Sequence, residues 1–316
     1  MHSEHGHVLV SQMNPNLTEV TVIGDDDTGV LTRVTSVLFE HDVELEELDQ
    51  QEEQGVFRVK ALADTSDADE SALEADLAAA CDDLGVDLRV RFPEDQGGDS
   101  LGILVTKESH CLEAMLEAVE SGALDADVEV VIGNHSTLAD IAEEHDVPFY
   151  DVGDENGNPD ESEILRLLEE HGVDVVALAR YIQIISPELV FHYENRIINV
   201  HPSLLPAFPG AAAYRQAVNG GARIAGVTAH YVTPNLDQGP IITQRAFNVP
   251  DDAEEADLKE QGQPLEADAL IEAVRLHVQG ALEVADGRTY VDDADADLGL
   301  PMEIRELNPS EPTDRN

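Results

Sequence analysis

Asn199 and His201 stand two positions apart at the end of a strand-like run, residues 196–200. Side chains of a strand alternate between its faces, so these two leave on the same face. Asp237 follows in a later loop, Leu-Asp-Gln-Gly-Pro. An amide and a protonated imidazole can donate hydrogen bonds to an oxyanion, while a carboxylate handles protons. With no obvious Ser or Cys nucleophile, this set predicts attack of an external nucleophile on a carbonyl group.

Each of these residues also has a purely structural interpretation. His201 could be a hydrogen-bonded loop histidine, Asn199 a cap or turn residue, and Asp237 a turn or helix-cap residue. It is their combination that favours catalysis.

The segments before Asn199 predict the sheet that would position it. Residues 101–105 are almost wholly apolar, as expected for a strand buried on both faces of a parallel sheet. Further apolar runs alternate with helix-like segments up to residue 200. This order predicts an α/β fold with a doubly wound, mostly parallel sheet, in which ligands bind beyond the carboxyl ends of the strands.

The N-terminal part has another plan. Its hydrophobic periodicity predicts the order βαββαβ, which is ferredoxin-like. We therefore predict a small domain at residues 17–92, a linker at 93–99, a catalytic domain at 100–292 and an acidic C-terminal tail at 293–316.

The charge of the chain is extreme, with 67 Asp and Glu against 17 Lys and Arg, a formal net charge of −50. Such a surface repels phosphate backbones and anionic lipids, so we expect neither nucleic acid nor membrane as a partner. Salt screens the self-repulsion, which predicts adaptation to a high-salt cytoplasm in a halophilic organism. The alternative, a chain that binds polycations or many metal ions, lacks a regular Asp/Asn/Gly calcium loop.

Other sequence signals are negative. There is no apolar run of about eighteen residues, and the start lacks the features of a signal peptide, so we expect a cytoplasmic protein. Cys81 and Cys111 fit neither a disulfide framework nor metal-ligand spacing, and we expect no metal.

Several stretches carry a family resemblance. Residues 199–206, Asn-Val-His-Pro-Ser-Leu-Leu-Pro, and residues 236–240 resemble the catalytic signature of folate-dependent formyltransferases. Residues 104–112, 131–135, 178–183 and 195–199 are similar to the formyltetrahydrofolate deformylase family, and the N-terminal domain resembles an ACT domain. The resemblance, from Leu17 to Val291, implies that Asn199, His201 and Asp237 polarise the formyl group of 10-formyltetrahydrofolate. It implies hydrolysis to formate and tetrahydrofolate for one-carbon and purine metabolism, with no permanently bound cofactor.

Related enzymes transfer the formyl group to an amine that carries a phosphate, as phosphoribosylglycinamide formyltransferase does. Those enzymes need a Gly-rich loop after the first strand for the phosphate. Here that loop has no glycine, and Glu108 would repel a phosphate. Pro202, where a deformylase typically has a second His, is closer to the transferase. Hydrolysis is favoured and transfer remains the alternative. A third hypothesis, a non-catalytic amino-acid sensor, is disfavoured because the three polar residues are retained.

The resemblance also implies a folate site, in which backbone atoms contact the pterin and isoleucines form apolar walls. Its residues are Arg180, Tyr181, Ile182, Gln183, Ile184 and Ile185. The alternative is that the isoleucines are ordinary strand-end core. Lys107, His110, Asn134 and His135 are further candidates near the site. The first two could instead be ion-pair partners, and the Asn-His-Ser stretch could be a helix N-cap.

An effector site is predicted in the small domain. Asp25, Asp26, Asp27, Thr28 and Gly29 form a strand-to-helix turn, where ACT domains often bind a small amino acid between copies. Backbone amides at the helix start could hold its carboxylate. The resemblance implies glycine or methionine as the effector and a homo-oligomer formed through ACT domains. The alternative is a pure dimerisation module in which the aspartates cap the helix.

Overall fold

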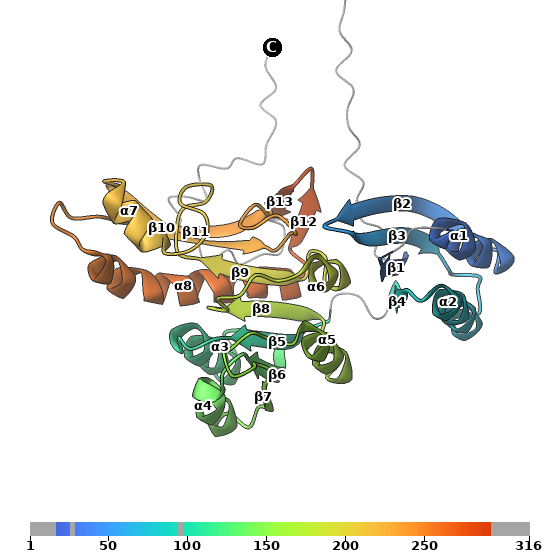
Figure 1. Cartoon of the computed structure of the whole chain (residues 1–316), viewed down its shortest axis with the longest axis horizontal. Helices are drawn as coiled ribbons and strands as arrows, with labels where there is room; N and C mark the ends of the chain where they lie inside the picture. The colour runs from blue at the N-terminus through green and yellow to red at the C-terminus, as the bar shows by residue number, and fades with distance from the viewer. Residues whose placement is uncertain (1–16, 26–28, 94–97, 292–316) are drawn as a thin grey trace, which may run out of the picture.

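The computed structural model describes residues 17–25, 29–93 and 98–291, which fold into two sheets with their helices and a short hairpin (Figure 1). The prediction of a ferredoxin-like unit followed by a doubly wound α/β unit is confirmed. Parts of the expected linker, residues 94–97, and the acidic tail from residue 293 onward lie outside the described residues.

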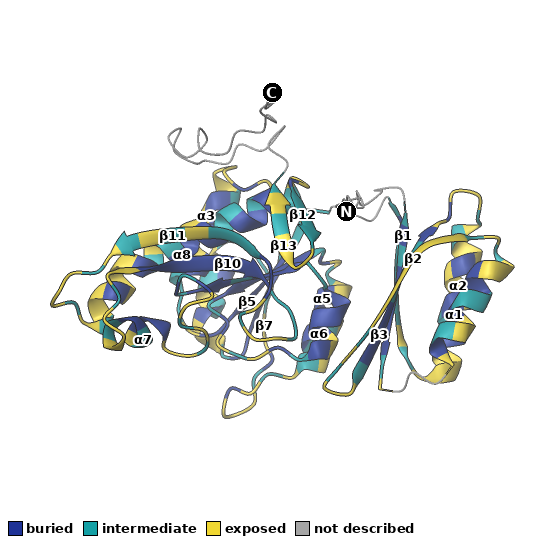
Figure 2. Cartoon of the chain, turned by 90° about the horizontal axis from the view of Figure 1, so that it is seen from above, coloured by how far each residue is buried: buried dark blue, intermediate teal, exposed yellow. Residues whose placement is uncertain are grey.

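The N-terminal unit has the predicted βαββαβ order. Its elements are β1 (Thr18–Gly24), α1 (Val30–Glu40), β2 (Glu44–Glu53), β3 (Val56–Asp64), α2 (Glu70–Leu84) and β4 (Asp87–Arg91). The strands pair antiparallel in the order β2-β3-β1-β4. Both helices cover one face of this sheet (Figure 2), where buried side chains such as Val22, Val59 and Leu77 form the core.

The second sheet has the order β11-β10-β9-β8-β5-β6-β7. Its strands are β5 (Ser100–Val105), β6 (Asp127–Gly133), β7 (Phe149–Asp151), β8 (Val175–Ala179), β9 (Ile197–His201), β10 (Ile224–Tyr231) and β11 (Ile241–Asn248). β5 to β9 run parallel, whereas β10 and β11 are antiparallel to their neighbours.

Helices cover both faces of this sheet, which explains the nearly continuous apolar strands. The helical elements are α3 (His110–Glu120), η2 (Ser136–Leu138), α4 (Ala139–Glu144), α5 (Glu161–Glu170), α6 (Pro187–His192), α7 (Ala213–Asn219) and α8 (Glu255–Val278). In β5, Ile103 joins the core with α3 and α8, while its neighbour Leu104 joins the core with α5 and α6. The hairpin of β12 (Leu282–Ala285) and β13 (Arg288–Val291) follows α8.

The junction between the two units is polar. Helix α6 packs against β1 and β3, on the face of the small sheet opposite α1 and α2 (Figure 2). Arg58 of β3 is only 2% exposed and forms ion pairs with Asp49 and with Glu194, which follows α6. Lys60 lies 2.7 Å from Glu19 and 3.4 Å from the same Glu194. Ion pairs therefore connect the small sheet to the catalytic unit.

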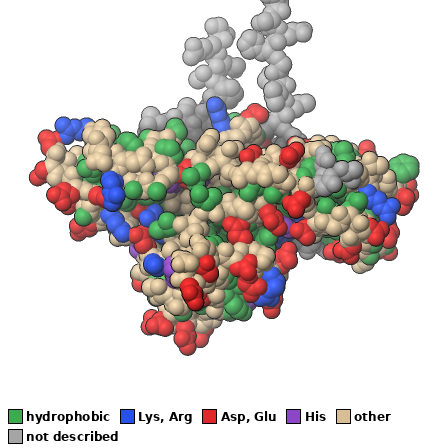
Figure 3. Space-filling view, in the orientation of Figure 1, with side chains coloured by type: hydrophobic (Ala, Val, Ile, Leu, Met, Phe, Trp, Pro, Cys, Tyr) green, Lys and Arg blue, Asp and Glu red, His purple; other side chains and the backbone are tan. Residues whose placement is uncertain are grey.

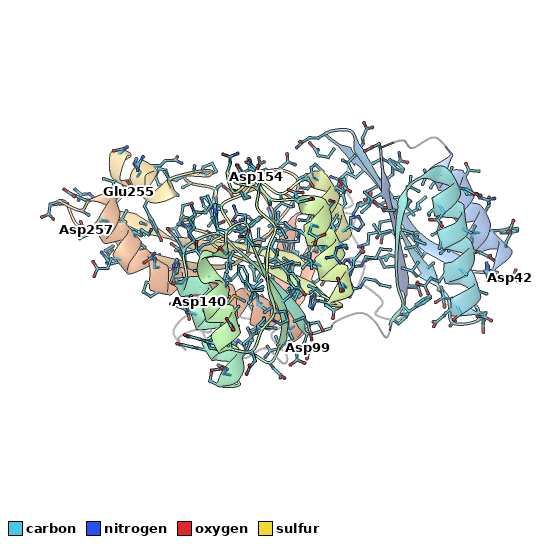
Figure 4. All side chains as sticks on the ribbon, turned by 60° about the horizontal axis from the view of Figure 1, so that its bottom comes forward. Asp42, Asp99, Asp140, Asp154, Glu255 and Asp257 are labelled. Carbon is cyan, nitrogen blue, oxygen red and sulfur yellow. The ribbon has the colours of Figure 1, made fainter. Side chains whose placement is uncertain are left out.

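Acidic side chains are spread over the visible surface, with few Lys and Arg among them (Figure 3). The six carboxylates labelled in Figure 4 come from both units, so the charge is not confined to one patch. This distribution agrees with the excess of Asp and Glu in the sequence. Adaptation to a high-salt habitat stays a prediction. Within residues 17–25, 29–93 and 98–291, no helix has the length and apolar character needed to cross a membrane.

Candidate active site

The structure brings Asn199, His201 and Asp237 to one cavity of about 500 Å³. Asn199 and His201 lie at the carboxyl end of β9, and Asp237 lies in the loop between β10 and β11. The cavity is therefore where ligands are expected in an open α/β sheet.

The backbone of the β10–β11 loop fixes Asp237. This residue has a left-handed conformation with φ of 54°. At Gly239 a Cβ atom would lie 1.8 Å from the carbonyl oxygen of Tyr231, so only glycine fits there. The Asp237 side chain is 5% exposed, and its Oδ2 accepts a hydrogen bond of 2.7 Å from the backbone N–H of Gly210. Its carboxylate is thus held in one position.

His201 is held from two sides. Its Nε2 donates to the carbonyl oxygen of Phe208 at 3.0 Å, and its Nδ1 lies 3.4 Å from Oδ2 of Asp237. Both ring nitrogens therefore face acceptors.

Asn199 is oriented by a residue that the sequence did not single out, His230. Nδ1 of His230 donates to the carbonyl oxygen of Tyr231 at 2.8 Å, which leaves Nε2 to accept from Nδ2 of Asn199 at 3.2 Å. Burial lowers the pKa of His230, which favours this neutral form. The second hydrogen on Nδ2 of Asn199 remains for a ligand.

The pairing of β9 with β10 explains why His230 was missed. In this antiparallel register Asn199 lies opposite His230. The strand at residues 226–233 was predicted, but its partner and register were not. The only signal in the sequence was a histidine in that strand. Knowing which strand it pairs with, and in what register, was needed to place this histidine beside Asn199.

All six residues of the predicted folate segment line the same cavity. Ile182 and Ile184 are 59% and 75% exposed, so they are not core residues, whereas Ile185 is buried in the core with α5 and α6. Arg180 has a left-handed backbone, and the N–H of Ile182 donates to Oγ1 of Thr106 at 3.0 Å. Two uncovered apolar side chains at a cavity wall are suited to contact a flat ring.

The four further candidates do not line this cavity. Lys107 is exposed. His110 lies 3.0 Å from Glu266, as in the ion-pair interpretation. Asn134 donates to the carbonyl oxygen of Gly157 at 2.7 Å, and the ring of His135 lies against the same glycine. Asn134 and His135 therefore contact the segment beside the folate wall, since Gln183 also lies 3.4 Å from the carbonyl oxygen of Gly157.

Two groups of side chains have the donor atoms of a metal site. His110, Cys111 and Glu266 form one, but Glu266 already binds Tyr214, Arg180 and His110, and burial raises the pKa of the Cys111 thiol. Asp87, Glu188 and His192 form the other, in which both nitrogens of His192 are closed off from solvent. The first group therefore does not offer three free donors to an ion.

A second cavity of about 470 Å³ lies beside the first, between the two units. Gln51 of β2 lines it on one side, and Glu194 and Asp286 line it on the other. Residues 232–234 line both cavities. The segment that leads to Asp237 is therefore a shared wall.

The predicted effector turn is described only in part. Asp26, Asp27 and Thr28 lie outside the described residues, while Asp25 is exposed and Gly29 has φ of 85° at the start of α1. Glu188 of α6 has a raised pKa, because of burial first and then the charges of Asp87 and Asp25. Asp25 thus lies near enough to α6 for its charge to act on Glu188.

Comparison with known proteins agrees with this geometry. Residues 101–274 match the family model described as formyl transferase, and residues 19–91 match the model described as ACT domain. A formyltetrahydrofolate deformylase of Bacillus subtilis (strain 168) is 34% identical over 276 residues, which cover 84% of this chain and 90% of that protein.

Solved structures extend the comparison. A formyltetrahydrofolate deformylase from Pseudomonas syringae pv. tomato str. DC3000 superposes with a TM-score of 0.60 at 30% identity, covering 88% of this chain and 94% of that one. Glycinamide ribonucleotide transformylase 1 from Symbiobacterium toebii gives 0.59 at 31% identity, but covers 66% of this chain and 98% of its own.

Proposed function

The chain belongs to the formyltetrahydrofolate deformylase family, and from this membership we propose that it hydrolyses 10-formyltetrahydrofolate to formate and tetrahydrofolate. The observation that carries the proposal is the convergence of Asn199, His201 and Asp237 on the cavity that Ile182 and Ile184 line. No permanently bound cofactor enters the reaction.

In the proposed reaction Asp237 is the general base. A water molecule attacks the formyl carbon and loses a proton to the carboxylate. The oxygen of the formyl group becomes an oxyanion as the new C–O bond forms. Asp237 then gives this proton to N10 of the folate, and the bond from the formyl carbon to N10 breaks as the oxyanion becomes a carbonyl group again.

Asn199 is the preorganised oxyanion donor. One hydrogen of its Nδ2 is bound to His230, so the other has a fixed direction. His201 has a different role at the start, because its Nε2 hydrogen is bound to the carbonyl oxygen of Phe208. Its donation to the oxyanion requires the ring to rotate away from the carbonyl oxygen, or the hydrogen to be shared between the two oxygens.

The folate ring is proposed to lie along residues 180–185, with Ile182 and Ile184 as its apolar wall. These two side chains would lose exposed apolar surface on binding, which contributes about 25 cal/mol for each Å² covered. Replacement of either by Ser should therefore raise KM more than it lowers kcat.

The test is release of formate from 10-formyltetrahydrofolate without an amine acceptor, by purified full-length protein in about 1 M KCl, where surface charge is screened. Release without an acceptor supports hydrolysis. Strict dependence on phosphoribosylglycinamide would establish the alternative, formyl transfer, which the structural likeness to the transformylase keeps worth testing.

The remaining roles belong to the same proposal. Residues 17–92 form a regulatory domain, joined by residues 93–99 to a catalytic domain at 100–292, and the enzyme acts in the cytoplasm. Glycine or methionine binds at Asp25–Gly29, between ACT domains of a homo-oligomer. Titration of both amino acids against formate release, with light scattering for the oligomer size, tests this part.

A further inference from the structure

The loop after β5 places a carboxylate between two cations at the catalytic cavity. Oε1 of Glu108 lies 2.5 Å from Nζ of Lys259, and its Oε2 lies 2.9 Å from Nε of Arg180. The three side chains come from distant parts of the chain, the β5–α3 loop, the end of β8 and α8. All three line the cavity.

The charges at this place balance only because Glu108 is present. Arg180 and Lys259 are the two Lys or Arg side chains among the described cavity-lining residues. Arg180 also lies 3.2 Å from the buried carboxylate of Glu266, which supplies a second negative charge. Without Glu108 the ammonium of Lys259 would have no partner here, and the local charge would be positive.

Glu108 is ionised in this setting. Burial alone would raise its pKa, but hydrogen bonds and charges of Lys259 and Arg180 outweigh burial and lower the pKa. Its side chain is 22% exposed and that of Lys259 is 46% exposed, so the lysine is the partner that solvent reaches more readily.

We propose that Glu108 determines the acceptor: its carboxylate fills an anion site formed by Arg180 and Lys259, and thereby excludes amines that carry a phosphate. A guanidinium and an ammonium that share one anion have the chemistry that binds phosphate. Helix α3 also begins two residues later without a side-chain cap, which adds positive potential. The inference rests on the proposed hydrolysis and explains how the cavity avoids the transferase substrate.

The direct test measures inorganic phosphate binding by calorimetry in about 1 M KCl, with the full-length chain. Wild type should bind phosphate only weakly. Glu108→Ala, which removes charge and opens space, should bind phosphate at least about tenfold more tightly than wild type. Glu108→Gln removes the charge alone and should lie between the two. Circular dichroism confirms that the variants fold.

Two controls identify the cause of any gain. Glu255→Gln removes another cavity-lining carboxylate, one that binds Arg215 at 2.7 Å, and should not create phosphate binding. The double variant Glu108→Ala, Lys259→Ala should lose the gain. Equal gain in Glu255→Gln, or a gain that survives the loss of Lys259, would overturn the proposal, as would absence of binding in Glu108→Ala.

Phosphoribosylglycinamide provides the second readout. It should inhibit formate release by Glu108→Ala at concentrations that leave wild type unaffected, and equal sensitivity of the two proteins contradicts the proposal. This failure is distinct from failure of the proposed function. If wild type releases formate but Glu108→Ala binds no phosphate, the proposed hydrolysis is supported and the proposed role of Glu108 in acceptor specificity is contradicted.

Discussion

The catalytic cluster and the junction between the two units both bury polar groups, but they satisfy them differently. Asn199, His201 and Asp237 have partners within their own unit, several of them backbone groups. At the junction, Arg58 binds Asp49 of its own unit and Glu194 of the other unit. Both ring nitrogens of His192 and the hydroxyl of Tyr193 are buried there without a hydrogen-bond partner.

This difference indicates separate roles. Partners within one rigid unit hold a reacting group in place at no cost when the substrate arrives. Buried groups without a hydrogen-bond partner cost free energy while the contact is closed, because water no longer solvates them. Ion pairs that bridge the two units contribute only while the units are in contact. The active site is therefore preorganised, while the junction is the part of the molecule that responds to charge and pH.

The largest effect should come from Asp237→Asn. The amide oxygen can still accept from Gly210, so the fold is kept, but the negative charge and the base are lost. We expect kcat to fall by about 10³-fold or more, from the usual size of general-base effects. Formate release and thermal denaturation measure the two properties. Near-normal turnover would exclude Asp237 as the base.

Arg58→Met should break the junction without affecting the catalytic cluster. Removal of one partner from a buried ion pair leaves Glu194 dependent on Lys60 alone, and we expect a loss of about 3 kcal/mol in unfolding free energy. Urea denaturation measures this loss. Arg33→Met, at an exposed pair with Asp83, is the control and should change little. Similar losses of unfolding free energy in the two variants would show that the Arg58 ion pair contributes no more to stability than an exposed pair.

Acid should weaken the junction through His192. Burial lowers its pKa to about 4, with Arg89 and Arg196 adding to the effect and Asp87 opposing it. The unfolded pKa is about 6.5, so between these values the unfolded state binds more protons, and stability falls as pH falls from 6.5 to 4. The full effect of this residue is about 3 kcal/mol.

The matched variant for this pH effect is His192→Leu, which removes the titrating ring from a site where neither nitrogen has a partner. Denaturation midpoints at pH 7 and pH 5 should differ less in this variant than in wild type. An unchanged pH slope would assign the acid sensitivity to other groups, such as His277, whose pKa burial also lowers to about 4.

The smallest effect should come from His230→Leu, which removes the acceptor that orients Asn199. We expect kcat to fall by about 10- to 100-fold with little change in KM, less than for loss of a direct oxyanion donor. His230→Gln offers an amide oxygen and should restore part of the rate. Equal rates in the two variants would reduce His230 to a packing role.

The features that could be predicted from the sequence are those that short segments of the chain determine. Strand periodicity and the spacing of Asn199 and His201 were sufficient for the fold class and for two members of the cluster. His230 needed the register of β9 with β10, and the junction ion pairs needed contacts such as Lys60 to Glu194, 134 residues apart. Local periodicity contains neither kind of information.

Helix α8 was not predicted from the sequence, for a different reason. It covers one face of the large sheet, yet it contains Gly262 and Pro264 and buries the charged Glu266. Gly262 is needed because a Cβ atom there would lie 1.8 Å from the hydroxyl oxygen of Tyr214. These tertiary requirements override helix propensity and blur the apolar stripe, so the sequence pattern did not reveal this helix.

Residues 232–234 separate the catalytic cavity from the cavity at the junction. A small molecule bound in the junction cavity would contact these residues directly, from the side opposite the proposed substrate. A screen for inhibitors of this enzyme can thus begin on the side of the wall where no folate competes.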